Sequence, residues 1–238
     1  HMIKVTRDAE LDMEGDVSKS YINKIVESVR DRFLAEPVRL VHDKDISKEA
    51  INMVKKILGV GTNDSLIPGG RYHHRRDYMN FPQLNRCDLQ YERKEALPIN
   101  GLSLEKSIFK AIKQKDYLLY TPYHSFSFVI KFLREAALDP EVTIIKITIY
   151  RLSKLSNVAS SLINAAKNGK KVLVQIELQA RFDETNNIIY AEQMQAAGVE
   201  LIFGIPGLKV HSKICVIEKS TQGKKRRYGF ISTGNFNE

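Results

Sequence analysis

The chain has 238 residues, of which 43% are hydrophobic and 27% charged, the balance of an ordinary globular protein with one or two domains. No apolar run approaches the roughly 18 residues that a membrane span requires, and charge comes too early at the N-terminus for a secretory signal peptide. The formal net charge of +9 indicates a polyanionic partner, but nucleic acid, a membrane surface, a nucleotide and an inorganic polyanion all fit.

The first part of the chain, residues 1–97, is expected to form only part of a domain. Residues 3–6 and 38–41 read as strands, and apolar residues recur at helical spacing from 22 to 33. Ser47 is placed to cap a helix over 48–58 that Gly59 ends. Because these elements are few, we predict a partial α+β domain here.

The second part, residues 98–238, alternates strands with helices of ten to fifteen residues, which indicates βαβ units. The last two strands are expected to pair as an antiparallel hairpin, with the basic run 219–227 as its solvated tip. We therefore predict an α/β fold with a mixed, mostly parallel sheet flanked by helices. The predicted strands are 117–121, 142–150, 171–178, 199–203, 210–218 and 227–232, and the helices are 103–114, 126–138, 158–168 and 184–197.

Three residues of interest lie near predicted strand ends at intervals of about one βα unit, and the third of them is His211. Arg151 follows the strand at 142–150, and Arg181 follows the strand at 171–178. Ligands of open α/β sheets collect beyond the carboxyl ends of the strands, so both guanidinium groups are expected at one edge. Each alone is more simply a solvated surface residue, but two at equivalent positions favour bidentate binding of phosphate.

His211 and Lys213 stand two residues apart on the predicted strand 210–218, which would turn both side chains to one face. A neutral imidazole nitrogen can attack phosphorus without a separate base. Lys213 would then bind a non-bridging phosphate oxygen, and Asn235, after Gly234, could orient the same group. A structural histidine is the plainer alternative, but with both arginines we predict a catalytic nucleophile.

Other candidates carry less information. His124 precedes a predicted helix N-terminus, where an anion could bind, although capping by Ser125 explains the pattern equally well. Asp183 and Glu184 could hold Mg²⁺ through water, but they more simply cap the following helix. The remaining candidates are His73 and His74, which are adjacent and so poorly placed for one metal ion, and Cys87 and Cys215, expected as buried or idle thiols in a reducing, cytoplasmic compartment.

Four segments, in this order, resemble the bacterial polyphosphate kinases of the first type, and a fifth resembles the later part of that family's head domain. The four are residues 147–151 (Ile-Thr-Ile-Tyr-Arg), 177–184 (Glu-Leu-Gln-Ala-Arg-Phe-Asp-Glu), 207–213 (Gly-Leu-Lys-Val-His-Ser-Lys) and 232–238 (Ser-Thr-Gly-Asn-Phe-Asn-Glu), and the fifth is residues 67–73 (Ile-Pro-Gly-Gly-Arg-Tyr-His). The resemblance covers nearly the whole chain. It implies a partial head domain over 1–97 and a first C-terminal, phospholipase D-like catalytic domain over 98–238, cut short at its end.

The resemblance also implies an activity and roles for the site residues. The family transfers the terminal phosphate of ATP reversibly to inorganic polyphosphate through a phosphohistidine, which here would be His211. It assigns Arg151 and Arg181 to a Mg²⁺ site, but guanidinium has no lone pair to give a metal, so we interpret them as phosphate ligands beside the ion. Family members have further domains that bring ATP-binding groups and a second histidine, so this chain alone is expected to be inactive.

The family's other properties are carried over as expectations. ATP, ADP and polyphosphate would be the partners in a cytoplasmic homo-oligomer, without nucleic acid and with at most peripheral membrane association. Two alternatives stay open. One is a phospholipase D-like phosphodiesterase or nuclease, which is weakened because Glu218 stands where that pattern has Asp. The other is a non-catalytic module that binds polyanions through its net charge.

Overall fold

The computed structural model describes residues 1–8, 34–61, 65–73, 75–82, 84–92, 94–121, 123–177, 184–204 and 211–236. The chain divides into two compact units, His1–Arg93 and Lys94–Glu238, whereas the sequence analysis placed the boundary after residue 97. The helix predicted between 22 and 33 lies outside the described residues.

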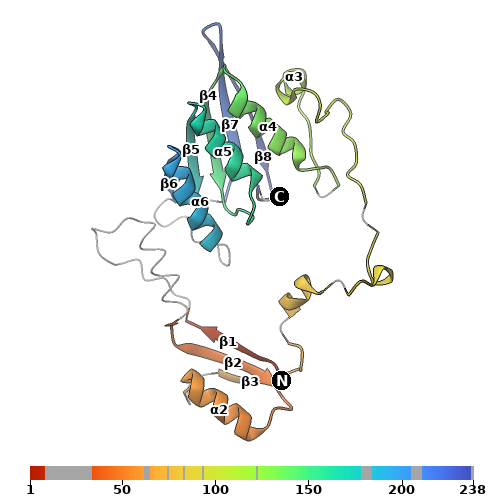
Figure 1. The fold of residues 1–238 in the computed structure, drawn as a ribbon, viewed down its shortest axis with the longest axis vertical. Coiled ribbons are helices and arrows are strands. Elements are labelled where there is room, and N and C mark those ends of the chain that lie inside the picture. Colours follow the sequence, from red (N-terminus) through yellow and green to blue (C-terminus); the bar gives the residue numbers. More distant parts are fainter. Residues whose placement is uncertain are drawn as a thin grey trace, which may run out of the picture. The chain divides into compact units, whose positions relative to one another are not determined.

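The described residues of the first unit form a three-stranded sheet with one helix packed on it (Figure 1). The strands β1 (Ile3–Arg7), β2 (Pro37–Asp43) and β3 (Ser65–Gly69) lie in that order, β1 antiparallel and β3 parallel to β2. The helix α2 (Lys48–Leu58) seals a small core of Leu40, Ile51 and Val60. Two short 3₁₀ turns follow, η1 (Arg75–Asn80) and η2 (Cys87–Leu89).

Both predicted ends of α2 are confirmed. The Ser47 hydroxyl accepts a hydrogen bond from Ala50 N, and Gly59 adopts a left-handed φ of 69° that ends the helix. Strand β3 is an element that the sequence analysis missed. Its Pro68 and Gly69 are typical of turns, but proline is tolerated here because β3 is an edge strand.

The second unit is built on a five-stranded sheet in the order β6-β5-β4-β7-β8. Strand β4 pairs in parallel with β5, and β5 with β6, while β7 is antiparallel to both β4 and β8. Four of the five strands therefore run in one direction, which confirms the predicted mixed, mostly parallel sheet and its C-terminal hairpin. The strands are β4 (Val142–Ile149), β5 (Lys171–Ile176), β6 (Glu200–Phe203), β7 (Lys213–Thr221) and β8 (Lys224–Ser232).

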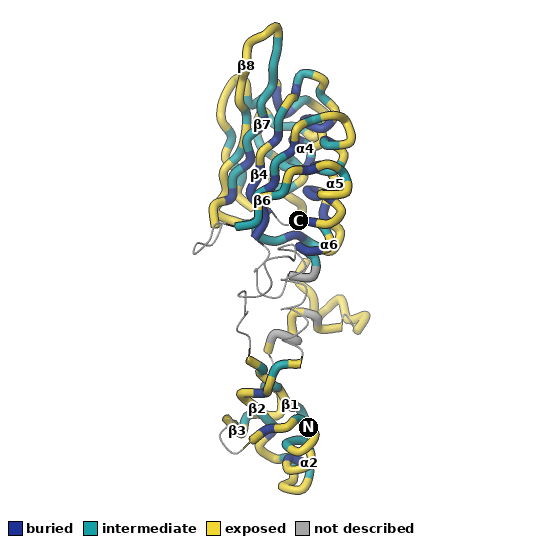
Figure 2. The backbone as a smooth tube through the Cα atoms, turned by 90° about the vertical axis from the view of Figure 1, so that its left-hand side faces the viewer, coloured by how far each residue is buried: buried dark blue, intermediate teal, exposed yellow. Residues whose placement is uncertain are grey.

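Helices cover one face of this sheet. The helices α4 (Ser127–Leu138), α5 (Asn157–Lys167) and α6 (Glu184–Ala196) lie side by side on that face in both views (Figures 1 and 2). Their buried side chains meet the alternate residues of β4 in the main core. Among the largest fully buried side chains are Leu133, Ile145, Leu162, Ile176 and Met194.

Two predictions before α4 are wrong in their extent or type. The helix expected over 103–114 shrinks to α3 (Ile108–Ile112), because the Glu135 carboxylate and the Ser107 hydroxyl cap its backbone N–H groups at that point. The strand expected over 117–121 is not a strand in the structure. Tyr120 N instead donates to His124 Nδ1, an acceptor only four residues away.

The C-terminal hairpin is longer than predicted, and its basic run is not one solvated loop. Strand β7 continues to Thr221, and a two-residue turn at Gln222 and Gly223, with φ of 50° and 75°, leads directly into β8. Lys219 therefore lies on a strand, with its Nζ 2.6 Å from Asp139 Oδ2 and 2.9 Å from Glu141 Oε2.

Candidate active site at the carboxyl ends of the strands

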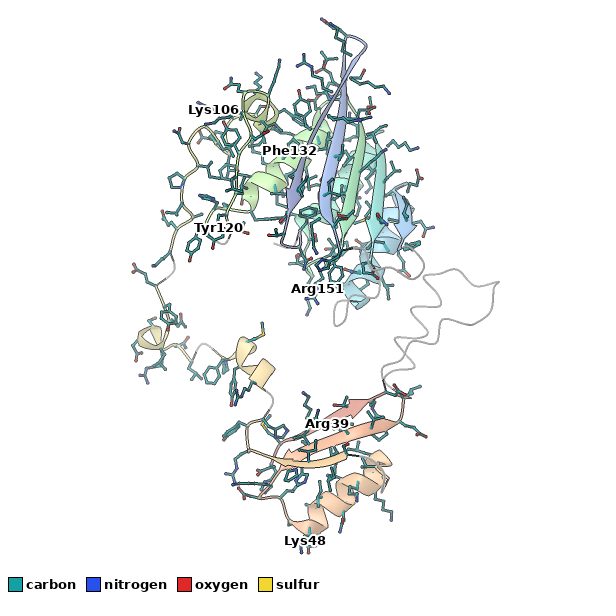
Figure 3. The ribbon with its side chains drawn as sticks, turned by 180° about the vertical axis from the view of Figure 1, so that it is seen from behind. Arg39, Lys48, Lys106, Tyr120, Phe132 and Arg151 are labelled. Atoms are coloured by element: carbon teal, nitrogen blue, oxygen red, sulfur yellow. The ribbon has the colours of Figure 1, made fainter. Side chains whose placement is uncertain are left out.

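The candidate site lies at one end of the five-stranded sheet. The carboxyl ends of β4, β5 and β8 meet there with the start of β7, since Lys213 pairs with Ser232 and Cys215 with Ile147. Arg151 follows the end of β4, and Figure 3 shows it at this edge. The topology therefore brings the described site candidates to the same end of the sheet.

The backbone around His211 differs from the prediction. Strand β7 begins at Lys213, so His211 precedes it and alternation along a strand does not set the direction of its ring. His211 is exposed, whereas Lys213 is only 5% exposed. The Lys213 ammonium donates a hydrogen bond to the backbone oxygen of His211 at 2.6 Å, so it holds the main chain that carries the histidine.

The Tyr150 ring lies beside three of the candidate site residues. Its centroid lies 5.8 Å from that of the His211 ring in an edge-to-face arrangement, and 5.4 Å from Lys213 Nζ. The guanidinium carbon of Arg151 lies 5.6 Å from the same ring. An aromatic face attracts cations and offsets part of the cost of burying the ammonium group. Contacts with the Tyr150 ring therefore bring His211 and Lys213 together, whereas the sequence analysis expected alternation along one strand to do so.

Thr148 fixes the start of β7 against β4. Its hydroxyl donates to Ser212 O at 2.7 Å and accepts from Ile214 N at 3.0 Å. These two bonds bracket Lys213 from the neighbouring strand. Thr148 lies near the end of β4, and Tyr150 follows two residues later, directly after the strand. The sequence analysis assigned no role to either residue.

Asn235 lies in the turn after β8. Gly234 N donates to the Ser232 hydroxyl at 3.0 Å, and the Phe236 ring packs 4.7 Å from that of Phe230, which seats the turn against the core. The Asn235 Oδ1 atom is buried and has no hydrogen-bond partner within the described residues. A buried acceptor in this state is costly unless a bound molecule donates to it.

Arg151 is half-buried, and the backbone on both sides of it is hydrogen-bonded by Asn187 of α6. The second predicted arginine, Arg181, lies outside the described residues, as do Asp183 and His74. Helix α6 begins at Glu184, whose side chain is also outside them. The structure thus brings His211, Lys213 and Arg151 together around one ring.

The weaker candidates have local partners. His124 accepts from Tyr120 N, and the Ser125 hydroxyl accepts from Ser127 N at the start of α4. Glu218 forms ion pairs with Lys225 and Arg227 across the hairpin, away from the site. The remaining three are His73, whose Nδ1 contacts Gly70 O, Cys87, which is exposed, and Cys215, where burial raises the pKa of the thiol.

The described residues do not fit a protein-held metal ion. They contain no group of three His, Cys, Asp or Glu side chains that could coordinate one. Arg151 has only donors, so it cannot serve as a ligand. The residues that are gathered here suit phosphate oxygens instead.

A mixed sheet flanked by helices, with a histidine, a lysine and an arginine at one end, defines an α/β protein with a candidate site at that end. Family models agree on a more specific class. The polyphosphate kinase C-terminal domain 1 matches residues 107–238, and the polyphosphate kinase middle domain matches residues 1–81. Because the first match alone spans more than half of the sequence, the chain belongs to the polyphosphate kinase family.

Individual relatives support this assignment. The chain is 43% identical to the polyphosphate kinase of Yersinia pestis over 238 residues and 42% identical to that of Escherichia coli K12 over 243, in each case over 100% of this chain and 35% of the relative. The crystal structure of polyphosphate kinase from Porphyromonas gingivalis aligns with a TM-score of 0.66 at 33% identity, over 85% of this chain and 31% of that one. The chain thus spans about a third of the length of these relatives. Among the described residues, no helix has the length and apolar character to cross a membrane.

Proposed function

We propose that this chain carries the phosphate-accepting histidine of a polyphosphate kinase. In this proposal His211 takes the terminal phosphate of ATP and passes it to inorganic polyphosphate, reversibly. The observation that carries the proposal is the placement of His211. The residue is exposed at the strand ends, its ring lies edge-to-face with that of Tyr150, and the buried ammonium group of Lys213 holds its backbone.

The chemistry proceeds in two displacements. An unprotonated imidazole nitrogen of His211 attacks the γ-phosphorus of ATP. A nitrogen–phosphorus bond forms, the bond from that phosphorus to the β,γ-bridging oxygen breaks, and ADP leaves with the electron pair. The other ring nitrogen keeps its proton, so the phosphorylated ring is cationic. A terminal oxygen of polyphosphate then attacks the phosphorus, which restores the neutral imidazole and lengthens the polymer by one phosphate.

The cations around Tyr150 would stabilise the charge that develops on the transferring phosphoryl group. Arg151 offers a planar fork of donors to phosphate oxygens. Lys213 contributes a positive charge that is held in place by its hydrogen bond to the backbone oxygen of His211. Asn235 Oδ1 can accept a hydrogen bond only, so a protonated ring nitrogen or a bound water suits it better than a phosphate oxygen. Arg181 is proposed as the second phosphate ligand on the strength of the sequence motif alone.

The remaining properties are proposed from the family relationship. Magnesium would arrive bound to the phosphates of ATP, because the described residues offer it no cluster of ligands. We expect the full-length polypeptide to act as a cytoplasmic homo-oligomer. The 238-residue chain alone would bind polyphosphate weakly through its cations and make none, because it spans only about a third of its relatives.

The proposal is tested by labelling the full-length polypeptide that carries this chain with ATP that is radioactive in its γ-phosphate. Phosphohistidine is labile in acid and stable in alkali, so the label should be lost at low pH and kept at high pH. It should be absent from His211→Ala. His124→Ala is the matched control, because that imidazole contacts backbone nitrogen four residues away and should leave labelling unchanged.

Two results would count against this function. Undiminished labelling of His211→Ala would place the nucleophile elsewhere. Absence of covalent label in the unaltered protein, together with tight binding of polyphosphate that weakens steeply with salt, would favour the non-catalytic polyanion-binding module.

A further inference from the structure

Asn187 on α6 is a fully buried amide that no step of the proposed reaction uses. Its Nδ2 donates to the backbone oxygens of Tyr150 and Glu177, both at 2.9 Å. Its Oδ1 accepts from Leu152 N at 3.2 Å. Both amide protons and one oxygen lone pair are therefore engaged with the backbone beyond the ends of β4 and β5.

These three bonds bracket Arg151. Tyr150 precedes the arginine, Leu152 follows it, and both have passed the last residue pair of the β4–β5 ladder, Ile149 with Ile176. The ladder ends there with a bond from Glu177 N to Ile149 O, so the backbone groups beyond it need partners from elsewhere. Asn187 supplies them and joins the two strand ends through one planar group.

Few side chains could replace this amide. The site requires two donors and one acceptor in a short fork, which asparagine alone provides at this length. Aspartate would set a carboxylate against two carbonyl oxygens, and leucine would fill the volume without making any of the bonds. The partners also fix the orientation of the amide, since the nitrogen faces two acceptors and the oxygen faces a donor.

Packing alone does not explain a polar residue at this position. The buried side of α6 continues with Ala191 and Met194, four and seven residues later, both fully buried. An aliphatic residue would complete that stripe. The same helix also holds the next part of the loop through Tyr190, whose hydroxyl accepts from Ser156 N at 2.8 Å and donates to Lys154 O at 3.0 Å.

We infer that Asn187 is a positioning residue that sets Arg151 at the phosphate site. The inference rests on the proposed function, because it assumes that Arg151 binds the phosphoryl group. Asn187 itself touches no substrate. It acts through the backbone on either side of Arg151, and its bond to Glu177 O anchors the amide to the end of β5.

The test compares Asn187→Leu with Tyr190→Phe in the full-length polypeptide. Both variants remove hydrogen bonds from α6 to the loop after β4, and each replaces a polar side chain by an apolar one of similar shape. We expect the larger loss of thermal stability in Asn187→Leu, because its bonds are the more deeply buried, so labelling is compared at a temperature where both variants are folded. The rate of acid-labile labelling of His211 should fall roughly 10- to 100-fold in Asn187→Leu and stay within about twofold in Tyr190→Phe, since small misplacements of a reacting geometry cost about that much.

A double variant shows whether the effect passes through Arg151. If it does, Asn187→Leu combined with Arg151→Ala should label no more slowly than Arg151→Ala alone, because the residue being positioned is already gone. Independent contributions would instead multiply, and that result would overturn the inference. Equal loss of labelling in Asn187→Leu and Tyr190→Phe at equal loss of stability would also overturn it.

Two further outcomes are decisive. If Asn187→Leu does not fold, Asn187→Ala takes its place, and failure of both to fold beside a folded Tyr190→Phe would make Asn187 purely structural and contradict the inference. If the unaltered protein shows no label on His211, the proposed function fails and the inference fails with it. Normal labelling of both the unaltered protein and a folded Asn187→Leu would contradict the inference alone.

Discussion

Two lysines of β7, six residues apart, lie at opposite ends of the strand in opposite electrostatic surroundings. Lys219, near the hairpin turn, is within 2.9 Å of two carboxylates, Asp139 and Glu141. Lys213, at the start of the strand, contacts a backbone oxygen and an aromatic ring, and no ion pair joins it to a carboxylate within the described residues. Lys213 is nevertheless the more buried residue, at 5% exposure.

The difference separates a cation that holds the fold together from one whose charge is available to a ligand. The charge of Lys219 is already neutralised, so it contributes to stability and attracts no anion. The charge of Lys213 is only partly offset by the dipole of a carbonyl and the face of a ring. Burying such a group costs free energy, and sites that bind or transfer anions commonly accept that cost. The two substitutions that remove these charges should therefore have opposite consequences.

The largest expected effect is that of Lys213→Met on phosphoryl transfer. Losing one preorganised cation should slow labelling of His211 roughly 10²- to 10³-fold, the scale seen when one stabilising group is removed from a transition state. Stability should change little or rise, because a poorly compensated buried charge is replaced by an apolar group of similar length. Labelling kinetics and thermal melting of the same preparation measure both quantities.

A fall in melting temperature as large as the one expected below for Lys219→Met would contradict the comparison. It would show that the bond from Lys213 to the His211 carbonyl stabilises the fold as strongly as an ion pair does.

Lys219→Met should have the opposite effect, lowering the stability of the fold and leaving phosphoryl transfer nearly unchanged. It removes a hydrogen-bonded ion pair whose two side chains are 19% and 20% exposed, so we expect a loss of roughly 1–2 kcal/mol and a melting temperature lower by about 5 °C. Labelling of His211 should stay within about twofold at temperatures where the variant is folded. Lys219→Arg is the matched control, since it keeps the charge and should recover most of the stability.

The same ion pairs should make stability depend on acid pH. Burial alone raises the pKa of Asp139, but hydrogen bonds from Lys219 and Glu141 N outweigh it and leave the pKa below its ordinary value of 3.8. The hydrogen bond from Lys219 lowers the pKa of Glu141 below 4.5. A carboxyl whose pKa is lower in the folded state stabilises the fold above its ordinary pKa, and this is lost as the pH falls through the folded value.

Urea unfolding of the 238-residue chain between pH 3 and pH 7 measures this dependence. The midpoint should fall as the pH drops below about 5. In Lys219→Met the curve should be flatter, because both carboxyl groups return toward their ordinary pKa values. Parallel curves for the two proteins would mean that other carboxyl groups govern the acid sensitivity.

Local patterns in the sequence were enough for the elements that depend on neighbouring residues. The caps of α2 at Ser47 and Gly59 and the apolar run of β4 were predicted with nearly the observed bounds. Segment 117–121 shows the limit of such patterns. Its composition suits a strand, but a strand also requires a partner, and this segment pairs with none of the described strands.

The site was predictable in its location and not in its contacts. Arg151 reaches this end of the sheet because it follows a parallel strand, as a βαβ fold requires, whereas His211 and Lys213 reach it because β7 runs antiparallel to β4 and begins there. The role of the Tyr150 ring depends on residues 61 and more positions apart in the chain, which no local spacing encodes. The interpretation of Lys219 as part of a solvated loop was wrong for the same reason, because its carboxylate partners lie about 80 residues away. The catalytic roles themselves stay predictions.

The smallest expected effect is that of Lys225→Met, which tests whether Lys219 stabilises the fold through its ion pairs alone or because those pairs are also partly buried. Lys225 also forms an ion pair on this hairpin, 3.3 Å from Glu218, but its side chain is 71% exposed. Arg227 pairs with the same carboxylate at 3.6 Å and would remain in the variant. Exposed pairs contribute little because water screens them and two long side chains must be ordered. Lys225→Met should therefore shift the melting temperature by less than about 1 °C, and 0.5 M salt should remove even that shift. If Lys225→Met lowered the melting temperature as much as Lys219→Met does, the ion pair alone would explain the contribution of Lys219 to stability. The lower exposure of Lys219 would then not be what distinguishes it from the exposed lysines of the hairpin.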